Sequence, residues 1–243
     1  MSKLLLVCPY WNGDRLAMEK SVRLACDLLD APTTQSELLF LSRHDAEEPS
    51  EEIFAYAKKK FYKVHYWRCS LKGSGYPQGC NDLAYGLFQY MADQRSIGHY
   101  PDISSLLILE SDCVITRKTW VEELQAEWNK HLAQGRKIVG AIQMRGQWGQ
   151  DTDYHVNAVA MYHPDILRFI PTLANGPADI GWDYYHRHVM LNHAGDTKLI
   201  KLDFRRESIT EEELYGKQSD VLIYHGVKGD SAINAVRNHH NLK

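Results

Sequence analysis

Short apolar runs alternate with segments of helical periodicity through the first half of the chain, and this alternation constrains the fold most strongly. The expected strands are residues 3–9, 36–42, 64–69 and 105–110. The expected helices between them are residues 14–29, 50–61 and 81–95. Such alternation is typical of parallel strands that are covered by helices. The sequence therefore predicts an α/β fold with a mostly parallel central sheet flanked by helices.

The second half departs from strict alternation, with more strands and more irregular loops. The expected helices are residues 116–134, 164–169 and 182–192, and the expected strands are residues 137–144, 155–162, 198–204 and 220–224. We therefore expect the sheet to become mixed toward the C-terminal half. Neither a repeat nor a long linker interrupts the sequence, which favours one domain over residues 1–243.

Charge and cysteine content exclude several protein classes. The formal net charge of -3 argues against a protein that coats nucleic acid, because such proteins are usually basic. The five cysteines are odd in number and form no CxxC pair, so reduced thiols are expected rather than a disulfide framework or zinc cluster. The apolar run at residues 4–8 is too short for a signal peptide core or a membrane span. These features predict a cytoplasmic protein.

Two carboxylates follow the most apolar expected strand. Glu110 and Asp112 stand at i and i+2, where side chains point the same way if strand geometry persists. Ligands of open α/β sheets sit at the carboxyl ends of strands. Burying two carboxylates there is costly unless a cation or hydrogen bonds offset the desolvation, and Mg²⁺ and Mn²⁺ prefer such oxygen ligands. The alternative is that the acids cap a loop or the next helix.

A second polar element follows the last expected strand, in residues 220–231. His225 enters a loop there and is followed by Gly226 and Lys228. A neutral imidazole can complete a metal's coordination sphere, and a lysine can meet phosphate as a point charge. The alternative is a strand-end histidine that bonds to the backbone.

These two elements together resemble metal-dependent glycosyltransferases of the GT-A kind, including small bacterial and phage enzymes. The acid-x-acid triplet, followed by an apolar pair and a tryptophan-bearing helix, resembles the DxD region of that family. The element from His225 to Lys228 resembles a His-Gly-x-Lys element near the C-terminus of several members. The resemblance implies a Rossmann-like GT-A fold, in which residues 1–115 bind a nucleotide sugar and residues 116–243 face the acceptor.

The resemblance also implies a ligand set. Asp112 and His225, with Glu110, would hold Mn²⁺ or Mg²⁺ on the diphosphate of a nucleotide sugar, for which a UDP-sugar is the expected donor. Ser111 would lie against the donor and Lys228 would contact the diphosphate. The first acid is Glu110 where the family usually has Asp, so Asp112 is the more strongly expected ligand.

Three further segments are expected to contact the donor, again by resemblance. The residues are Pro9, Tyr10, Trp11, Asn12, Arg43, Lys72, Gly73 and Asn81. Tyr10 or Trp11 would stack on the base, although packing on the sheet explains an aromatic loop equally well. Arg43 would contact the nucleotide or lie exposed. Asn81 is expected to be the N-cap of the helix at residues 81–95, or nearly so, and to reach the donor.

The acceptor side is expected in the second half of the chain. Asp183 opens a helix and would be the general base of an inverting enzyme, or would only orient the acceptor in a retaining one. Its alternative role is to complement the helix dipole. Trp182 would stack on a sugar or base, or pack in the core. Gln143, Arg145 and Trp148 belong to a long polar and aromatic segment that is expected to bind the acceptor or close over it.

The resulting functional hypothesis is transfer of a hexosyl or pentosyl group to a hydroxyl acceptor. The acceptor is either a saccharide or a hydroxymethylated pyrimidine in phage DNA, in which case the protein would work in the host cytoplasm. A nucleotidyltransferase is one alternative, but residues 9–14 lack its basic, glycine-rich loop, and the chain carries neither a Walker sequence nor GxGxxG. A non-catalytic nucleotide- or sugar-binding module is the other alternative.

Overall fold

A computed structural model of the chain describes residues 2–145, 153–202, 208–216, 220–227 and 229–242. Its central feature is a seven-stranded sheet in the order β3-β2-β1-β4-β7-β6-β8. These strands are β1 (Lys3–Tyr10), β2 (Ser36–Ser42), β3 (Val64–Arg68), β4 (Ile103–Ile108), β6 (Ile138–Arg145), β7 (Asp153–Tyr162) and β8 (Ala194–Asp196). Strands β3, β2, β1 and β4 are parallel, whereas β7 is antiparallel to both β4 and β6. The predicted change from a parallel to a mixed sheet is confirmed.

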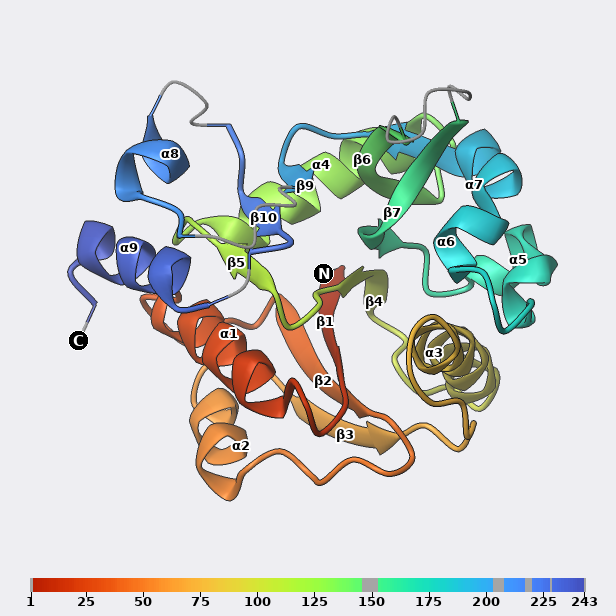
Figure 1. Ribbon diagram of the computed structural model, residues 1–243, viewed down its shortest axis with the longest axis horizontal. Coiled ribbons are helices and arrows are strands. Elements are labelled where there is room, and N and C mark those ends of the chain that lie inside the picture. The colour runs from red at the N-terminus through yellow and green to blue at the C-terminus, as the bar shows by residue number, and fades with distance from the viewer. Residues whose placement is uncertain (1, 146–152, 203–207, 217–219, 228, 243) are drawn as a thin grey trace.

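A second sheet of three short strands lies beside the first. It consists of β5 (Cys113–Ile115), β10 (Ile223–His225) and β9 (Ile200–Leu202), with β10 in the middle. Strand β10 runs antiparallel to β5 and parallel to β9. This sheet joins residues just after the fourth strand of the chain to residues near the C-terminus, as Figure 1 shows.

Helices cover both faces of the large sheet because alternate residues of its strands point to opposite sides. Leu4 and Leu6 of β1 belong to one core, and Leu5 and Val7 belong to the other. The first core packs under α1 (Arg15–Asp27), α2 (Glu51–Lys58), α4 (Trp120–Ala133), α8 (Glu211–Tyr215) and α9 (Ser231–His240). The second packs under α3 (Gln78–Ser96), α5 (Ile166–Phe169), the 3₁₀ turn Pro171–Ala174, α6 (Trp182–Tyr185) and α7 (Arg187–His193).

The second half of the chain departs from the expected elements in several places. The expected helix at residues 116–134 is preceded by β5 and begins at Trp120, and the expected helix at residues 182–192 is split into α6 and α7. Strand β8 and helices α8 and α9 were not expected. Helix α9 lies beside α1 in Figure 1 and carries the C-terminal segment back over the first core. Within the described residues, no helix has both the length and the apolar character needed to span a bilayer.

Candidate functional site

A cavity of about 590 Å³ opens at the carboxyl ends of β1 and β4, the position at which open α/β sheets bind ligands. The loop after β1, the beginning of α3 and the turn after β4 form its walls. Trp182 and residues beside α9, including Val227 and Asp230, complete them. Of the residues predicted to bind ligands, the cavity is lined by Pro9, Tyr10, Trp11, Glu110, Ser111, Asp112 and Trp182.

The two predicted carboxylates and the predicted histidine meet beside this cavity. Glu110 and Asp112 belong to the turn between β4 and β5, and His225 is the last residue of β10. The Nε2 atom of His225 lies 2.9 Å from Glu110 Oε2 and 3.3 Å from Asp112 Oδ1. Both carboxylates therefore lie on the same side of the turn, as the i, i+2 spacing predicts.

The positive charge of His225 partly offsets the charges of the two carboxylates. Burial lowers the pKa of His225, but hydrogen bonds to Asp112 and Glu110 outweigh it and raise that pKa to about 10. The imidazolium thus carries positive charge between the two carboxylates. A divalent cation would take the place of that charge, because carboxylate oxygens and an imidazole nitrogen are suitable ligands for Mn²⁺. The donor set therefore fits the metal that the sequence suggests.

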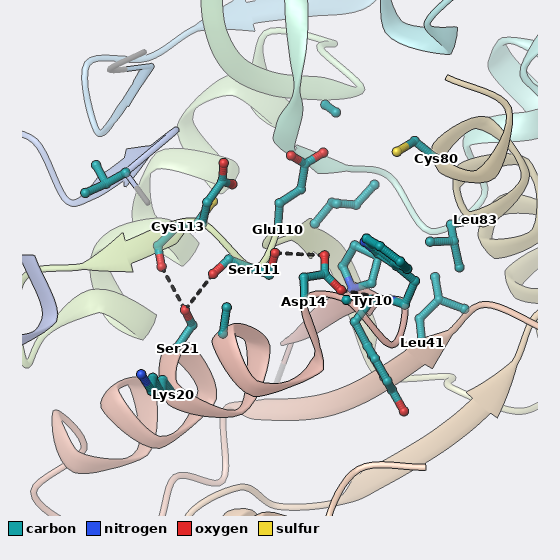
Figure 2. Close-up of a pocket in the computed structure, with 18 of the residues that line it drawn as sticks. Tyr10, Asp14, Lys20, Ser21, Leu41, Cys80, Leu83, Glu110, Ser111 and Cys113 are labelled. Carbon is teal, nitrogen blue, oxygen red and sulfur yellow. Dashed lines mark hydrogen bonds between the residues drawn. The ribbon is translucent and has the colours of Figure 1, made fainter. Parts of the chain in front are cut away.

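The loop after β1 is fastened to the acidic turn through Asp14. Its Oδ1 atom accepts a hydrogen bond from the Trp11 backbone N–H at 2.8 Å, and its Oδ2 atom accepts one from Ser111 Oγ at 2.9 Å. The hydroxyl of Ser21 in α1 lies 3.1 Å from the carbonyl oxygens of Ser111 and Cys113 (Figure 2). Sequence reasoning did not identify Asp14 or Ser21 as site residues, although a polar residue before a helix is a usual sign of a fixed loop.

The two aromatic residues of this loop have different environments. Tyr10 is fully buried and its hydroxyl donates to the Glu47 carbonyl at 2.9 Å, so its ring packs into the sheet. The Trp11 side chain is 47% exposed, and the Arg43 guanidinium carbon lies 5.3 Å from its ring centroid. Trp11 is therefore the ring that is free to stack on a base.

Arg43 and Asn12 make contacts within the protein. The guanidinium of Arg43 donates to both carboxylate oxygens of Asp45, at 2.5 and 2.7 Å. The side chain of Asn12 donates to the Asp45 carbonyl at 3.3 Å and accepts from the Glu47 N–H at 2.7 Å. Neither side chain lines the cavity. Both side chains connect the Trp11 loop to the segment that follows β2.

The predicted residues around the start of α3 are placed differently from expectation. Asn81 is not the N-cap, because α3 begins at Gln78. Its buried amide donates to the carbonyls of Pro177 and Ile180, at 3.0 and 2.8 Å, and accepts from the Trp182 N–H at 2.9 Å. Asn81 therefore positions the start of α6.

Gly73 and Lys72 precede α3 and lie outside the cavity lining. The Gly73 N–H donates to Asp82 Oδ2 at 2.5 Å, and a Cβ at this position would lie 2.6 Å from the same oxygen. A side chain at this position would require the Asp82 and Gln78 side chains to shift. Lys72 is exposed.

Asp183 lies in the first turn of α6, and its Oδ1 atom accepts from the Tyr184 N–H at 2.9 Å. Burial raises its pKa most, nearby His155 opposes this, and the charge of Glu110 adds to the rise. The carboxylate is thus a stronger base than an exposed aspartate. Trp182 is only 4% exposed, and its ring packs against Phe88 and Tyr162, which supports the core alternative.

The remaining predicted residues lie either outside the cavity lining or outside the described residues. Gln143 is half-buried in β6 and does not line the cavity. Arg145 lies at the end of β6, but its side chain is outside the described residues. Trp148 and Lys228 also lie outside them.

Comparisons with known proteins identify the fold. No family model and no curated protein matches the sequence. Among solved structures, the chain superposes on residues 1–349 of S. aureus TarS with a TM-score of 0.55 and 10% identity, over 98% of this chain and 64% of that chain. The galactosyltransferase LgtC, in complex with donor and acceptor sugar analogs, gives 0.55 and 10%, over 98% and 96% of the two chains. Mouse xyloside xylosyltransferase 1 in its apo form gives 0.54 and 14%, over 93% and 97%.

These similarities establish a GT-A fold for the chain. The chain spans less than two thirds of the TarS fragment and nearly the whole length of the other two proteins. The GT-A fold that the sequence predicts is therefore confirmed, together with its mixed central sheet.

Proposed function

We propose that this chain transfers a hexosyl or pentosyl group from a nucleotide sugar to a hydroxyl acceptor, with help from a divalent metal ion. The observation that carries the proposal is the convergence of Glu110, Asp112 and His225 beside a cavity at the carboxyl ends of β1 and β4. The GT-A fold supports it, because the solved structures that share the fold are glycosyltransferases.

The proposed donor is a UDP-sugar. Crystal structures of TarS contain UDP-GlcNAc and UDP, which supports a uridine nucleotide in a related fold. Trp11 offers an exposed ring to the base, and Asp112 and His225, with Glu110, would hold Mn²⁺ or Mg²⁺ near the diphosphate. When bound, that metal would neutralise the charge that develops on the departing diphosphate. Lys228 remains a predicted diphosphate contact.

Asp183 is the proposed general base. Its raised pKa makes the carboxylate a better proton acceptor, and its position at the start of α6 is fixed through Asn81. In an inverting reaction, Asp183 would accept the proton of the attacking hydroxyl. In a retaining reaction, the same carboxylate would orient the acceptor.

A saccharide is the proposed acceptor class. Two basic runs in the sequence could contact DNA phosphates. Lys58–Lys60 with Lys63 lies away from the cavity, and Arg205–Arg206 lies outside the described residues. Lys63 directly precedes β3 at the amino ends of the parallel strands, whereas the cavity opens at their carboxyl ends. Lys20 does line the cavity, but it pairs with Asp230 at 2.7 Å. A hydroxymethylated pyrimidine in DNA is the alternative, and salt-sensitive duplex binding would favour it.

The thermal stability of the protein with a panel of nucleoside diphosphates and nucleotide sugars tests the proposal. A ligand at 100 times its dissociation constant stabilises the folded state by about 2.7 kcal/mol. We expect a raised melting temperature with UDP and Mn²⁺ together, which Asp112→Asn removes. The matched control, Asp30→Asn, changes an exposed acid that pairs with Lys118 outside the cavity lining, and it should keep the shift.

Product analysis then separates the rival activities. A glycosyltransferase releases a nucleoside diphosphate from a nucleotide sugar, a nucleotidyltransferase releases pyrophosphate from a nucleoside triphosphate and a sugar phosphate, and a binding module releases neither. Failure of every nucleotide to raise the melting temperature, at millimolar ligand and metal, would overturn the proposal.

A further inference from the structure

The thiol of Cys113 lies directly beside the acid and histidine cluster. Cys113 begins β5 and is the register partner of His225 in β10, so the two side chains project from the same face of the small sheet. One ligand atom each from Asp112, Cys113 and His225 lie within 4.8 Å of one another. Cys113 also lines the cavity, although its side chain is only 1% exposed. Figure 2 shows the residue next to the acidic turn.

These three side chains form a different donor set from the two carboxylates and the histidine. A carboxylate, a thiolate and an imidazole suit Zn²⁺ and Co²⁺, whereas Mg²⁺ and Mn²⁺ prefer oxygen ligands. Tetrahedral coordination at 2.0–2.1 Å places two N or O ligands about 3.3 Å apart. The Asp112 Oδ1 to His225 Nε2 distance is 3.3 Å. Zinc can therefore be accommodated with little movement of these two residues.

Glu110 separates the two possible modes of binding. Its Oε2 atom contacts His225, yet Glu110 is not a member of the group that contains the thiol. An ion that takes the sulfur ligand is drawn toward the seam between β5 and β10. An oxygen-preferring ion would instead remain between the two carboxylates and the imidazole.

We propose that Cys113 is a metal ligand that gives this chain a binding mode for thiophilic divalent ions, with Asp112 and His225 as the other protein ligands. This inference rests on the metal site of the proposed function and adds a ligand to it. On binding, the Cys113 sulfur–hydrogen bond and the His225 Nε2–hydrogen bond break, sulfur–metal and nitrogen–metal bonds form, and both protons pass to solvent. Because both modes use Asp112 and His225, Zn²⁺ and Mn²⁺ exclude one another.

Cobalt is the probe that tests this ligand set, since Co²⁺ bound to a thiolate has a near-ultraviolet charge-transfer band. We expect one equivalent of Co²⁺ to produce this band in the full chain and Zn²⁺ to remove it. Cys113→Ser should abolish the band, and Cys113→Ala should weaken Zn²⁺ binding about 10-fold or more in competition with a chromophoric chelator. Circular dichroism confirms that each variant is folded.

Cys80→Ser is the control, because the exposed thiol of Cys80 lines the same cavity and is the competing source of such a band. This variant should keep the band. A wild-type protein that lacks the band, or a folded Cys113→Ser protein that retains it, would overturn the inference. If neither Cys113 variant folds, alkylation of the wild-type Cys113 thiol is measured by mass spectrometry under partly denaturing conditions. Protection of this thiol by zinc would support the inference, and alkylation at the same rate with and without zinc would overturn it.

The outcomes also separate this inference from the proposed function. A UDP and Mn²⁺ shift in melting temperature without a thiolate band supports the transferase and overturns only the role of Cys113. A thiolate band without any nucleotide-dependent shift supports the thiophilic site and counts against the transferase.

Discussion

His225 and Glu110 are separated by 115 positions in the sequence, yet Nε2 of the histidine lies 2.9 Å from Oε2 of the glutamate. The contact depends on the pairing of β10 with β5, because β5 directly follows the acidic turn and His225 is the register partner of Cys113. A short antiparallel strand pair therefore assembles the cluster. Removing the imidazole would leave Glu110 and Asp112 facing each other without the intervening positive charge.

We predict that His225→Gln destabilises the metal-free protein. Lost hydrogen bonds to charged groups cost about 1.5–3 kcal/mol, toward the lower end here because the Glu110 side chain is partly exposed. Each 1 kcal/mol corresponds to about 2–4 °C in melting temperature for a chain of this size. Thermal denaturation in a chelating buffer measures the change. His239→Gln, at an exposed histidine of α9, is the matched control, and equal melting temperatures for wild type and His225→Gln would contradict the prediction.

The first half of the fold could be predicted from sequence because its strands are continuous apolar runs. Strand β2 has the predicted bounds, and every one of its residues is buried. The acidic turn was recognisable for the same reason, since two carboxylates after such a run are chemically unusual. The local pattern of apolar residues therefore indicates both the strands and the position of the acidic turn.

The missed elements lack such a pattern. Strand β5 has only three residues, and the sequence pattern showed them only as an apolar pair between the acidic triplet and the helix expected at residues 116–134. Helix α9 buries chiefly small residues, Ala232, Ala235 and Val236, which give a weak signal. The role of Asn81 depends on carbonyls nearly 100 positions away, and no local pattern shows such a contact.

We predict that Asn81→Ala destabilises the protein and impairs transfer. The substitution removes three hydrogen bonds to residues 177–182 and leaves the buried Trp182 N–H without its partner, whereas the Pro177 and Ile180 carbonyls are only partly buried. A buried unsatisfied group costs about 1–3 kcal/mol, so we expect a loss of about that size in unfolding free energy. Chemical denaturation measures the loss. Asn81→Asp keeps the shape but removes the donor group and should behave similarly; a variant as stable as wild type would contradict this role.

We predict that Trp11→Ala weakens nucleotide binding without a large effect on stability. The ring is half-exposed, and stacking of an aromatic side chain on a base is worth about 1–3 kcal/mol. The dissociation constant of UDP, measured by calorimetry in the presence of Mn²⁺, should rise about 5- to 150-fold. Trp11→Phe should recover much of the affinity. Tyr76→Ala removes another highly exposed aromatic ring that lies outside the cavity lining and serves as the control. Unchanged affinity in Trp11→Ala would assign the base to another surface.

We predict that Asp183→Asn lowers the rate of transfer while it raises the stability of the folded protein at neutral pH. Burial raises the pKa of Asp183, so its folded-state pKa exceeds its unfolded value and the folded protein holds the proton more tightly. The stability that this group contributes is therefore present at low pH and is lost as pH rises through the folded-state pKa. At neutral pH the partly buried carboxylate carries a desolvation cost that Asn does not, while the Asn side-chain oxygen can still accept the Tyr184 N–H bond.

The expected result is a variant that transfers sugar at least 100-fold more slowly, as for loss of a general base, and has a higher melting temperature at pH 7–8. Its stability advantage should vanish below the unfolded pKa of aspartate, about 3.9. In the wild type, the rate should fall on acidification through the raised pKa. Asp179→Asn, an exposed acid on the same segment, is the control for both measurements. An Asp183→Asn enzyme with a normal rate but a raised melting temperature would show that this carboxylate is buried without serving as the base.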